Sequence, residues 1–206
     1  MIGIINYGAG NLRSVWNAVS YIGGDVCVLD NPKEISKCTH LLLPGVGSFA
    51  NASRKLYSED WKSSIETVVS AGLPILGICL GMQLLLDVGY EDGESPGLGL
   101  IEGEVLRFPP HANYSLPHIG WNSLDLEEAN HPLLRGIKNS TDVYFVHSYY
   151  CEVKHHENVL TKTLFSQEFA SGIFKNNVAG LQFHPEKSQP SGLKILKNFL
   201  KWDGSC

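Results

Sequence analysis

The sequence lacks the features that would place it in several large classes of protein. Its first apolar stretch is too short to span a bilayer, and no secretory segment precedes that stretch. Its 206 residues include only five cysteines, an odd number at irregular spacings without a C-x-x-C pair, so neither a disulfide framework nor a zinc site is indicated. We therefore expect a cytoplasmic protein with reduced thiols that is not bound to a membrane.

The chain also has little charge, no repeats and no dinucleotide fingerprint. A net charge of -5 argues against broad binding to nucleic acid. The eight histidines show no metal-ligand spacing, so we expect no metal. The segment Gly8-Ala-Gly-Asn11 lacks the third glycine of a dinucleotide site, where Arg13 stands, so we expect no cofactor. Without a long linker or a repeat, residues 1–206 are expected to form a single domain.

What the first half contains is an alternation of strand and helix patterns. The segment Asn11–Ile22 has apolar residues at helical spacing, and a second helix is expected from a cap at Ser58 or Asp60 to Ala71. Strands separated by helices predict an α/β fold with a mostly parallel central sheet and helices on both faces. The expected strands are Ile2–Asn6, Val26–Leu29, Leu41–Leu43 and Pro74–Ile78.

The second half is richer in short β segments broken by turns. These segments predict additional antiparallel strands in the C-terminal half, added to the same sheet or packed beside it. An amphipathic helix is expected over Ser191–Trp202. The expected strands are Val105–Phe108, Asn122–Leu126, Val143–Val146, Tyr149–Val153, Val159–Leu164, Ala170–Phe174 and Ala179–Phe183.

Cys79 is the most informative residue of the chain. It lies in Gly77-Ile-Cys-Leu-Gly81, between an apolar strand and an apolar helix, which is the pattern of a sharp turn that projects a nucleophile. The first free amides of the helix, at Leu80, would favour a thiolate and hold an oxyanion. The alternative is a buried structural cysteine.

A base and an orienting group for that cysteine are found near the C-terminus. His184 and Glu186 stand two residues apart in an extended segment, so both side chains can face one cleft. Pro185 between them resists helix formation. His184 would take the proton from Cys79 and later donate one to the departing amine, while Glu186 would fix its tautomer. A surface or core histidine and a solvated glutamate are the alternatives.

A third segment, Pro44-Gly-Val-Gly47, follows an apolar strand. Its two glycines allow backbone conformations that other residues avoid, so an amide near Val46 could supply a second oxyanion donor beside that of Leu80. A plain strand-to-helix loop is the alternative.

These three segments, in this order, resemble the class I glutamine amidotransferases, the triad glutaminases. The matching residues are Pro44–Gly47, Gly77–Gln83 and Phe183–Glu186, and the resemblance covers nearly the whole chain. It implies L-glutamine as the substrate and a triad of Cys79, His184 and Glu186. It also implies that the glutamine is held by Gly47, Gln83, His147, Ser148 and Tyr149.

Three further segments resemble the glutaminase subunits of imidazole glycerol phosphate synthases. They are Asn6–Ser14, Pro117–Asn122 and Tyr144–Tyr149. Such a subunit makes ammonia, which a (β/α)₈-barrel cyclase subunit receives through a channel to form imidazole glycerol phosphate in histidine biosynthesis. The resemblance implies a heterodimer and places Asn11, Trp121 and Lys187 where the family meets its partner. A core aromatic and a solvated lysine are the alternatives for Trp121 and Lys187.

Other functions stay open at this point. Some related chains serve a different ammonia acceptor, such as an enzyme that amidinates a surface sugar, and residues 108–115 and 202–206 contain no motif that chooses between acceptors. A cysteine hydrolase of another class would have no need of Gln83 together with the Gly-x-Gly loop. A regulatory module without activity would require a missing triad member, and none is missing.

Overall fold

The computed structural model describes residues 1–205, and Cys206 lies outside the described residues. The strands are β1 Ile2–Ile5, β2 Val26–Leu29, β3 His40–Gly45, β4 Ile75–Cys79, β5 Val88–Gly89, β6 Ser95–Pro96, β7 Gly103–Arg107, β8 His118–Leu126, β9 Thr141–His147, β10 Tyr149–Val153, β11 Val159–Leu164, β12 Glu168–Lys175 and β13 Val178–Leu181. The α-helices are α1 Leu12–Tyr21, α2 Phe49–Ser58, α3 Trp61–Ser70, α4 Leu80–Leu84 and α5 Gln189–Phe199. Short 3-10 helices are η1 Pro32–Lys37, η2 Pro132–Leu134, η3 His156–Asn158 and η4 Pro185–Lys187.

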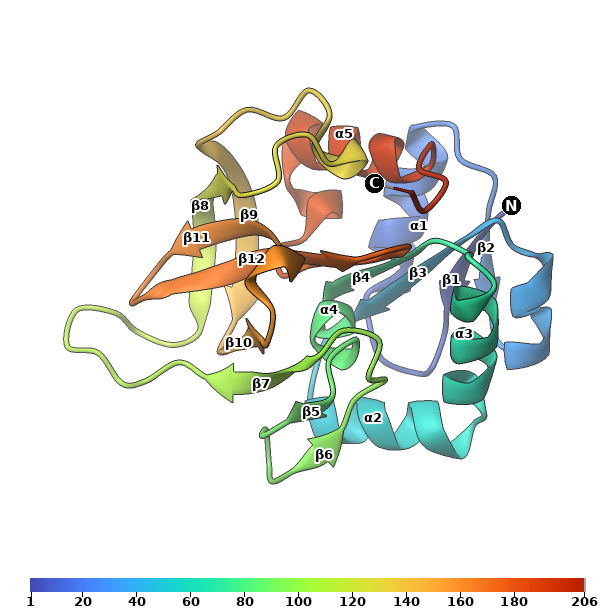
Figure 1. The fold of residues 1–206 in the computed structure, drawn as a ribbon, viewed down its shortest axis with the longest axis horizontal. Helices are drawn as coiled ribbons and strands as arrows, with labels where there is room; N and C mark the ends of the chain where they lie inside the picture. The colour runs from blue at the N-terminus through green and yellow to red at the C-terminus, as the bar shows by residue number, and fades with distance from the viewer. Residues whose placement is uncertain (206) are drawn as a thin grey trace.

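These strands form one mixed sheet (Figure 1). Its first part, in the order β2-β1-β3-β4-β13, is parallel throughout. Beyond β13 the strands β12, β10 and β7 pair antiparallel, and β11, β8 and β9 branch from β12. The predicted fold class, a mostly parallel sheet with antiparallel strands from the C-terminal half, is confirmed.

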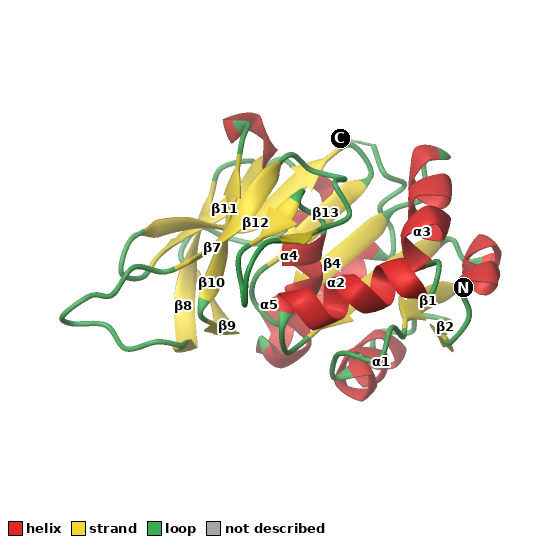
Figure 2. Ribbon diagram, turned by 90° about the horizontal axis from the view of Figure 1, so that it is seen from below, coloured by secondary structure: helices red, strands yellow, loops and turns green. Residues whose placement is uncertain are grey.

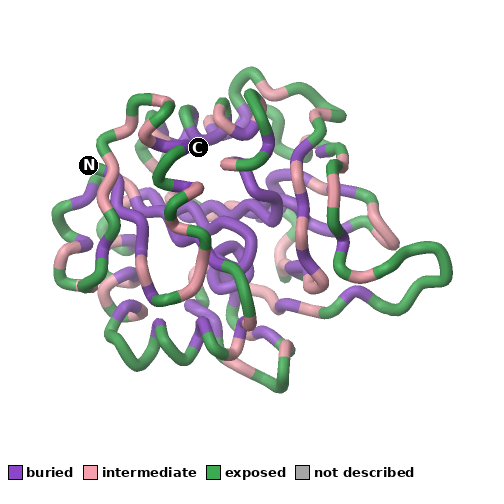
Figure 3. Tube along the Cα trace, turned by 180° about the vertical axis from the view of Figure 1, so that it is seen from behind, coloured by how far each residue is buried: buried purple, intermediate pink, exposed green. Residues whose placement is uncertain are grey.

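Helices cover both faces of the parallel part. α1 and α5 lie on one face, while α2, α3 and α4 lie on the other (Figures 1 and 2). Because side chains alternate along a strand, Leu41 and Leu43 join the core under α2 and α3, whereas Leu42 joins the core under α1 and α5. The buried segments accordingly run through the middle of the molecule, with exposed segments around them (Figure 3).

The helices differ from the predictions in three places. α2 was not predicted, because its few buried positions are diluted by polar residues. α3 begins after Asp60 as predicted, but Asp60 adopts a left-handed conformation and its side chain makes no capping hydrogen bond. α4 follows Cys79 as expected but has only five residues, Leu80–Leu84, all of them buried, so the helix ends before the apolar run does.

The described cysteines are free thiols. None of the helices within residues 1–205 combines the length and apolar character needed to cross a membrane.

Candidate active site

Cys79 occupies a strained turn between β4 and α4. Its backbone angles are φ 55° and ψ -111°, a region that costs a residue with a side chain about 1–3 kcal/mol. A β-carbon on Gly77 would lie 2.5 Å from the carbonyl oxygen of Gly81, and one on Gly81 would lie 1.6 Å from that of Leu43. The predicted sharp turn is therefore present, and close backbone packing is the reason that glycine stands on both sides of the cysteine.

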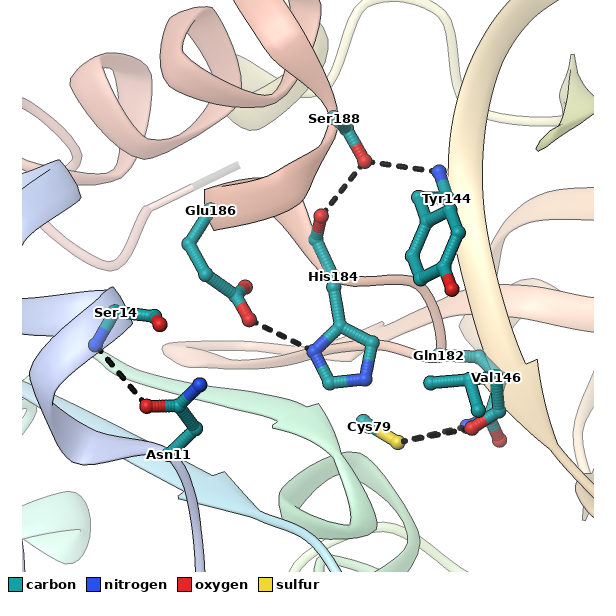
Figure 4. Close-up of polar contacts among 9 residues, drawn as sticks. All are labelled: Asn11, Ser14, Cys79, Tyr144, Val146, Gln182, His184, Glu186 and Ser188. Carbon is teal, nitrogen blue, oxygen red and sulfur yellow. Dashed lines mark hydrogen bonds and ion pairs between the residues drawn. The ribbon is translucent and has the colours of Figure 1, made fainter. Parts of the chain in front are cut away.

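His184 and Glu186 lie beside this turn because β13 pairs in parallel with β4. The Nδ1 atom of His184 is 2.8 Å from the Oε1 atom of Glu186, and the side chains are only 3% and 1% exposed. The other edge of the ring turns towards Cys79 (Figure 4). Its Nε2 atom makes no hydrogen bond within residues 1–205, so it is free to exchange a proton with a group near the sulfur.

The backbone around His184 is tied to β9. The hydroxyl of Ser188 donates to the carbonyl oxygen of His184 at 2.7 Å and accepts from the amide of Tyr144 at 3.0 Å (Figure 4). A second bond joins the amide of His184 to the carbonyl of Tyr144 at 2.9 Å. Ser188 therefore helps to hold the ring in place, a role that the sequence analysis did not identify.

The environment of His184 favours the charged ring. Burial lowers the pKa of this histidine, but interactions with Cys79 and Glu186 outweigh burial and raise the pKa to about 9. An imidazolium stabilises a neighbouring thiolate and can donate a proton to a leaving group.

The sulfur of Cys79 has two further polar neighbours. It is 3.9 Å from the carbonyl oxygen of Val146, and the side-chain amide of Gln182 donates to it at 3.8 Å. Gln182 is fully buried and was not among the predicted site residues. The signal was its spacing, because it stands two residues before His184 on the same extended segment.

A pocket of ≈ 330 Å³ opens at Cys79, within the usual range for small-molecule sites. It brings together the residues that were predicted for the oxyanion and for the substrate. These are Val46, Gly47, Leu80, Gln83, His147, Ser148 and Tyr149.

The two glycines of the predicted oxyanion loop serve different purposes. Gly47 has φ +106°, a conformation that favours glycine. Gly45 does not share this conformation; there, a β-carbon would lie 2.2 Å from the hydroxyl of Tyr7. Close packing, and not backbone freedom, is therefore the reason for glycine at position 45. Val46 between them is 44% exposed and lines the pocket.

Two polar side chains in the pocket wall, Gln83 and Glu91, already make hydrogen bonds to the protein, which determines the groups that they can offer to a ligand. The amide nitrogen of Gln83 donates to the carbonyl of Tyr149 and to the side-chain oxygen of Gln182, both at 3.1 Å, so Gln83 offers a ligand its oxygen. Glu91, which the sequence analysis missed, also lines the pocket, and its carboxylate accepts from the amide of Phe49 at 2.7 Å. No motif marks Glu91, which stands in the loop after β5.

The residues predicted for a partner interface lie in two places. Trp121 is 48% exposed, so the core alternative is wrong. The rings of Trp121 and Tyr144 are 6.0 Å apart, and the amine of the exposed Lys187 lies 5.8 Å from the Tyr144 ring. Asn11 is exposed at the start of α1, where its side chain accepts from the amide of Ser14 at 3.3 Å (Figure 4).

Across the described part of the chain, histidine, cysteine and acidic side chains do not cluster in threes that could hold a metal ion.

Comparisons with known proteins agree with this geometry. A sequence model of the family "Glutamine amidotransferase class-I" matches residues 3–202. The chain is 46% identical to imidazole glycerol phosphate synthase subunit HisH of Desulfitobacterium hafniense (strain Y51), over 98% of this chain and 94% of that protein. It is also 46% identical to subunit HisH 1 of Campylobacter jejuni (strain 81-176), over 98% and 100% of the two chains. A solved structure described as a glutamine amidotransferase has a similar fold, with a TM-score of 0.75 over 98% of both chains at 18% identity.

Proposed function

Because the chain belongs to the class-I glutamine amidotransferase family, we propose that it is the glutaminase subunit of an imidazole glycerol phosphate synthase. It hydrolyses L-glutamine to glutamate and ammonia. The observation that carries this proposal is the buried His184–Glu186 pair beside the strained Cys79, at the edge of a pocket of small-molecule size.

The first half of the reaction forms a thioester. The Cys79 thiolate attacks the side-chain amide carbon of glutamine, and a tetrahedral intermediate with a negatively charged oxygen forms. His184 donates its proton to the amide nitrogen, and ammonia leaves as the carbon–nitrogen bond breaks. Glu186 stabilises the imidazolium from which that proton comes, since its carboxylate lies on the opposite ring nitrogen.

The second half returns the enzyme to its starting state. The neutral His184 takes a proton from a water molecule, and the resulting hydroxide attacks the thioester carbon. The carbon–sulfur bond breaks, which releases glutamate and restores the thiolate beside an imidazolium. We assign the oxyanion in both halves to the amides of Leu80 and Val46, which line the same pocket as the sulfur.

The polar groups of the pocket suit the two ends of glutamine. The carboxylate of Glu91 can receive the α-ammonium group, because opposite charges attract strongly in a partly closed site. The side-chain oxygen of Gln83 can accept a hydrogen bond from an N–H group of the substrate. Gly47 and the segment His147-Ser148-Tyr149 form the remaining wall against which the substrate is held.

We further propose that the chain works as a heterodimer with a (β/α)₈-barrel cyclase subunit in the cytoplasm. Ammonia is mostly protonated in water at neutral pH and is then a poor nucleophile, so direct transfer to the cyclase protects it. The cyclase then uses the ammonia in the lyase step that forms imidazole glycerol phosphate. The exposed Trp121 and Lys187, with the half-buried Tyr144 between them, support a partner surface, and Asn11 is assigned to the same interface.

The alternative acceptors have less support. Identity to the two synthase subunits extends over 94% and 100% of their lengths, which favours the cyclase over a surface-sugar enzyme. The pocket residues Gln83 and Gly47, which a cysteine hydrolase of another class does not need, both face the site.

A conformational change of the loop Gly45–Gly47 would couple the glutaminase activity to the state of the cyclase subunit. The left-handed Gly47 and the exposed Val46 allow an amide to turn into the oxyanion position when the partner is loaded.

Glutamate release by the isolated chain, and by its complex with the cyclase and the cyclase's nucleotide ligand, tests the proposal. We expect weak activity alone, strong stimulation in the complex, and no activity for Cys79→Ala in a folded state. Equal turnover with and without the partner would reject the coupling, and an active Cys79→Ala variant would reject the nucleophile.

A further inference from the structure

A chain of hydrogen bonds runs from β8, which lies between β11 and β9, to the wall of the substrate pocket. The side-chain nitrogen of Asn122 lies 3.3 Å from the Nε2 atom of His118. The Nδ1 atom of His118 lies 2.9 Å from the Nε2 atom of His147, and the Nδ1 atom of His147 lies 2.8 Å from the carbonyl oxygen of Tyr149. His147 and Tyr149 line the pocket, whereas the catalytic scheme above makes no use of His118 or Asn122.

The direction of every bond in this chain follows from its two ends. At the inner end, the carbonyl of Tyr149 can only accept, so His147 carries its proton on Nδ1 and presents a lone pair on Nε2. His118 must then donate from Nδ1 and accept at Nε2. The two ring nitrogens of each histidine therefore have different, defined roles.

The outer end independently requires the same direction. The oxygen of the Asn122 side chain accepts from the amide of Ser123 at 2.8 Å, and its nitrogen donates to the carbonyl of Leu164 at 2.8 Å. These backbone partners fix the orientation of the side-chain amide, so its nitrogen faces the Nε2 atom of His118 as a donor.

Burial keeps both rings neutral, as this arrangement requires. His118 and His147 are 4% and 6% exposed. Burial lowers the pKa of His118 to about 4 and, as the largest effect on it, lowers that of His147 to about 3. A neutral ring has one proton, so each histidine can donate in only one direction.

Packing holds the central ring in place. His118 is stacked between Phe165, at 4.1 Å, and Phe145, at 4.9 Å between ring centres. The strands β8 and β9 pair His118 directly opposite His147, so the two rings meet across the hairpin. The donor on His118 is thus presented at a fixed position.

We infer that His118 and Asn122 are positioning residues for glutamine binding: they commit the Nδ1 proton of His147 to the Tyr149 carbonyl and so fix the pocket wall between Val146 and Tyr149. The inference rests on the proposed function for its ligand. Its physical basis is that a wall segment held by a defined tautomer is pre-organised, so less free energy is lost in ordering it when the substrate binds.

Two substitutions at position 118 separate this role from ordinary packing. His118→Asn places an amide nitrogen near the position of Nδ1, so it keeps a donor for His147 but loses the stacked ring. His118→Phe keeps a ring between Phe145 and Phe165 but has no donor. If the donor matters, His118→Asn binds glutamine better than His118→Phe, although His118→Phe is the more stable of the two variants.

The measurement is the glutaminase KM and kcat of the complex with the cyclase subunit, together with urea unfolding of each variant. We expect His118→Phe to raise the KM for glutamine about tenfold with kcat changed less than about twofold, and His118→Asn to stay within about twofold of the wild type. His118→Phe should nevertheless be the more stable of the two. If the KM follows stability instead, so that His118→Asn is the weaker binder, the inference fails.

His131 supplies a matched control. It is also 4% exposed, it accepts from the amide of Leu133 at 3.2 Å, and it lies outside the residues that line the pocket. His131→Asn and His131→Phe should leave the KM for glutamine unchanged. A wild-type complex that does not hydrolyse glutamine would count against the proposed function, which is a different failure from a wrong ranking at position 118.

The wild-type tautomers can be read without any variant or substrate. In a ¹⁵N-histidine sample, long-range proton–nitrogen correlations should show His118 and His147 both protonated on Nδ1 from pH 6 to 8. Protonation of either ring on Nε2 would overturn the inference even if the variants fail to fold.

Discussion

At the scale of single residues, His184 experiences two opposing influences. Burial favours the neutral ring, while Cys79 and Glu186 favour the charged ring and raise its pKa to about 9. The carboxylate of Glu186 is therefore expected to set the pH range over which the imidazolium can protonate departing ammonia.

Replacing Glu186 by Gln should lower kcat by about 10²–10⁴-fold and move the alkaline limb of the pH–rate profile to lower pH. The sign follows because the substitution removes an influence that raises the pKa and leaves burial, which lowers it. Steady-state glutaminase rates from pH 6 to 10 provide the measurement.

Glu157→Gln is the control, because Glu157 also stands two residues after a histidine, the half-buried His155. Its carboxylate lies 3.9 Å from the Nδ1 atom of that ring. This control should change neither kcat nor the alkaline limb of the pH–rate profile. A Glu186→Gln variant whose alkaline limb stays in place would contradict the role of the carboxylate.

Some site residues were predictable from local pattern and others were not. Cys79 stands between two glycines in a pattern that indicates a sharp turn. His184 and Glu186 stand two residues apart, which indicates that their side chains lie on the same side of the chain. Gln182 and His118 were missed because their partners, Gln83 and His147, are distant in the chain. His118 meets His147 through the pairing of β8 with β9, whereas Gln182 meets Gln83 of α4 because β13 lies beside β4.

At the scale of the elements, α4 is packed directly against β3. The close approach of Gly81 to the carbonyl of Leu43 lets the turn at Cys79 sit at the end of the sheet. A side chain there would separate the elements that carry the nucleophile and the oxyanion loop.

Gly81→Ala should therefore lower the free energy of unfolding by about 3 kcal/mol or more, since the new β-carbon would meet backbone that cannot move aside. Gly72→Ala is the matched control. Its β-carbon meets nothing within 4 Å, and only its φ of +95° opposes alanine, so a loss of about 1 kcal/mol is expected. Urea denaturation of both variants measures the difference, and equal losses would show that the contact at Gly81 is easily relieved.

Element prediction succeeded where the apolar pattern was strong and failed where it was diluted. The parallel strands and α1 have dense apolar positions, and their predicted bounds agree with the structure to within a few residues. α2 buries only Phe49, Ala52, Ser53 and Leu56, and β5 and β6 have two residues each, too few to show a period. The bounds of α4 depend on tertiary packing, because every residue around it is buried.

At the scale of the whole molecule, several histidines are buried in a neutral state. Burial lowers the pKa of His131 and of His118 to about 4, while both would titrate near 6.5 in the unfolded chain. As the pH falls below about 6.5, the unfolded state binds protons that the folded state excludes, so stability is lost until the pH reaches about 4. His184 adds nothing to this loss, because its raised pKa leaves it protonated in both states there.

His131→Asn should reduce the loss of stability between pH 7.5 and 5.0 by about 2 kcal/mol. The asparagine can still accept from the amide of Leu133 as a cap, but it does not titrate. Urea unfolding of the wild type and the variant at the two pH values tests this. Parallel pH dependences for the two proteins would mean that His131 is protonated in the folded state as easily as in the unfolded one.

The expectation that residues 1–206 form a single domain stays a prediction. The continuous sheet and the two cores on its faces are compatible with it.

Within residues 1–205, the last strand along the sequence is β13, which lies in the middle of the sheet, between β4 and β12. On the ribosome, the thiol is therefore made well before its imidazole partner. Until β13 inserts, an unfinished polypeptide holds a cysteine with no base beside it and cannot consume the cell's glutamine. Completion of the sheet thus brings the nucleophile and its base together in one event, and a chain cut short before its central strand lacks catalytic activity.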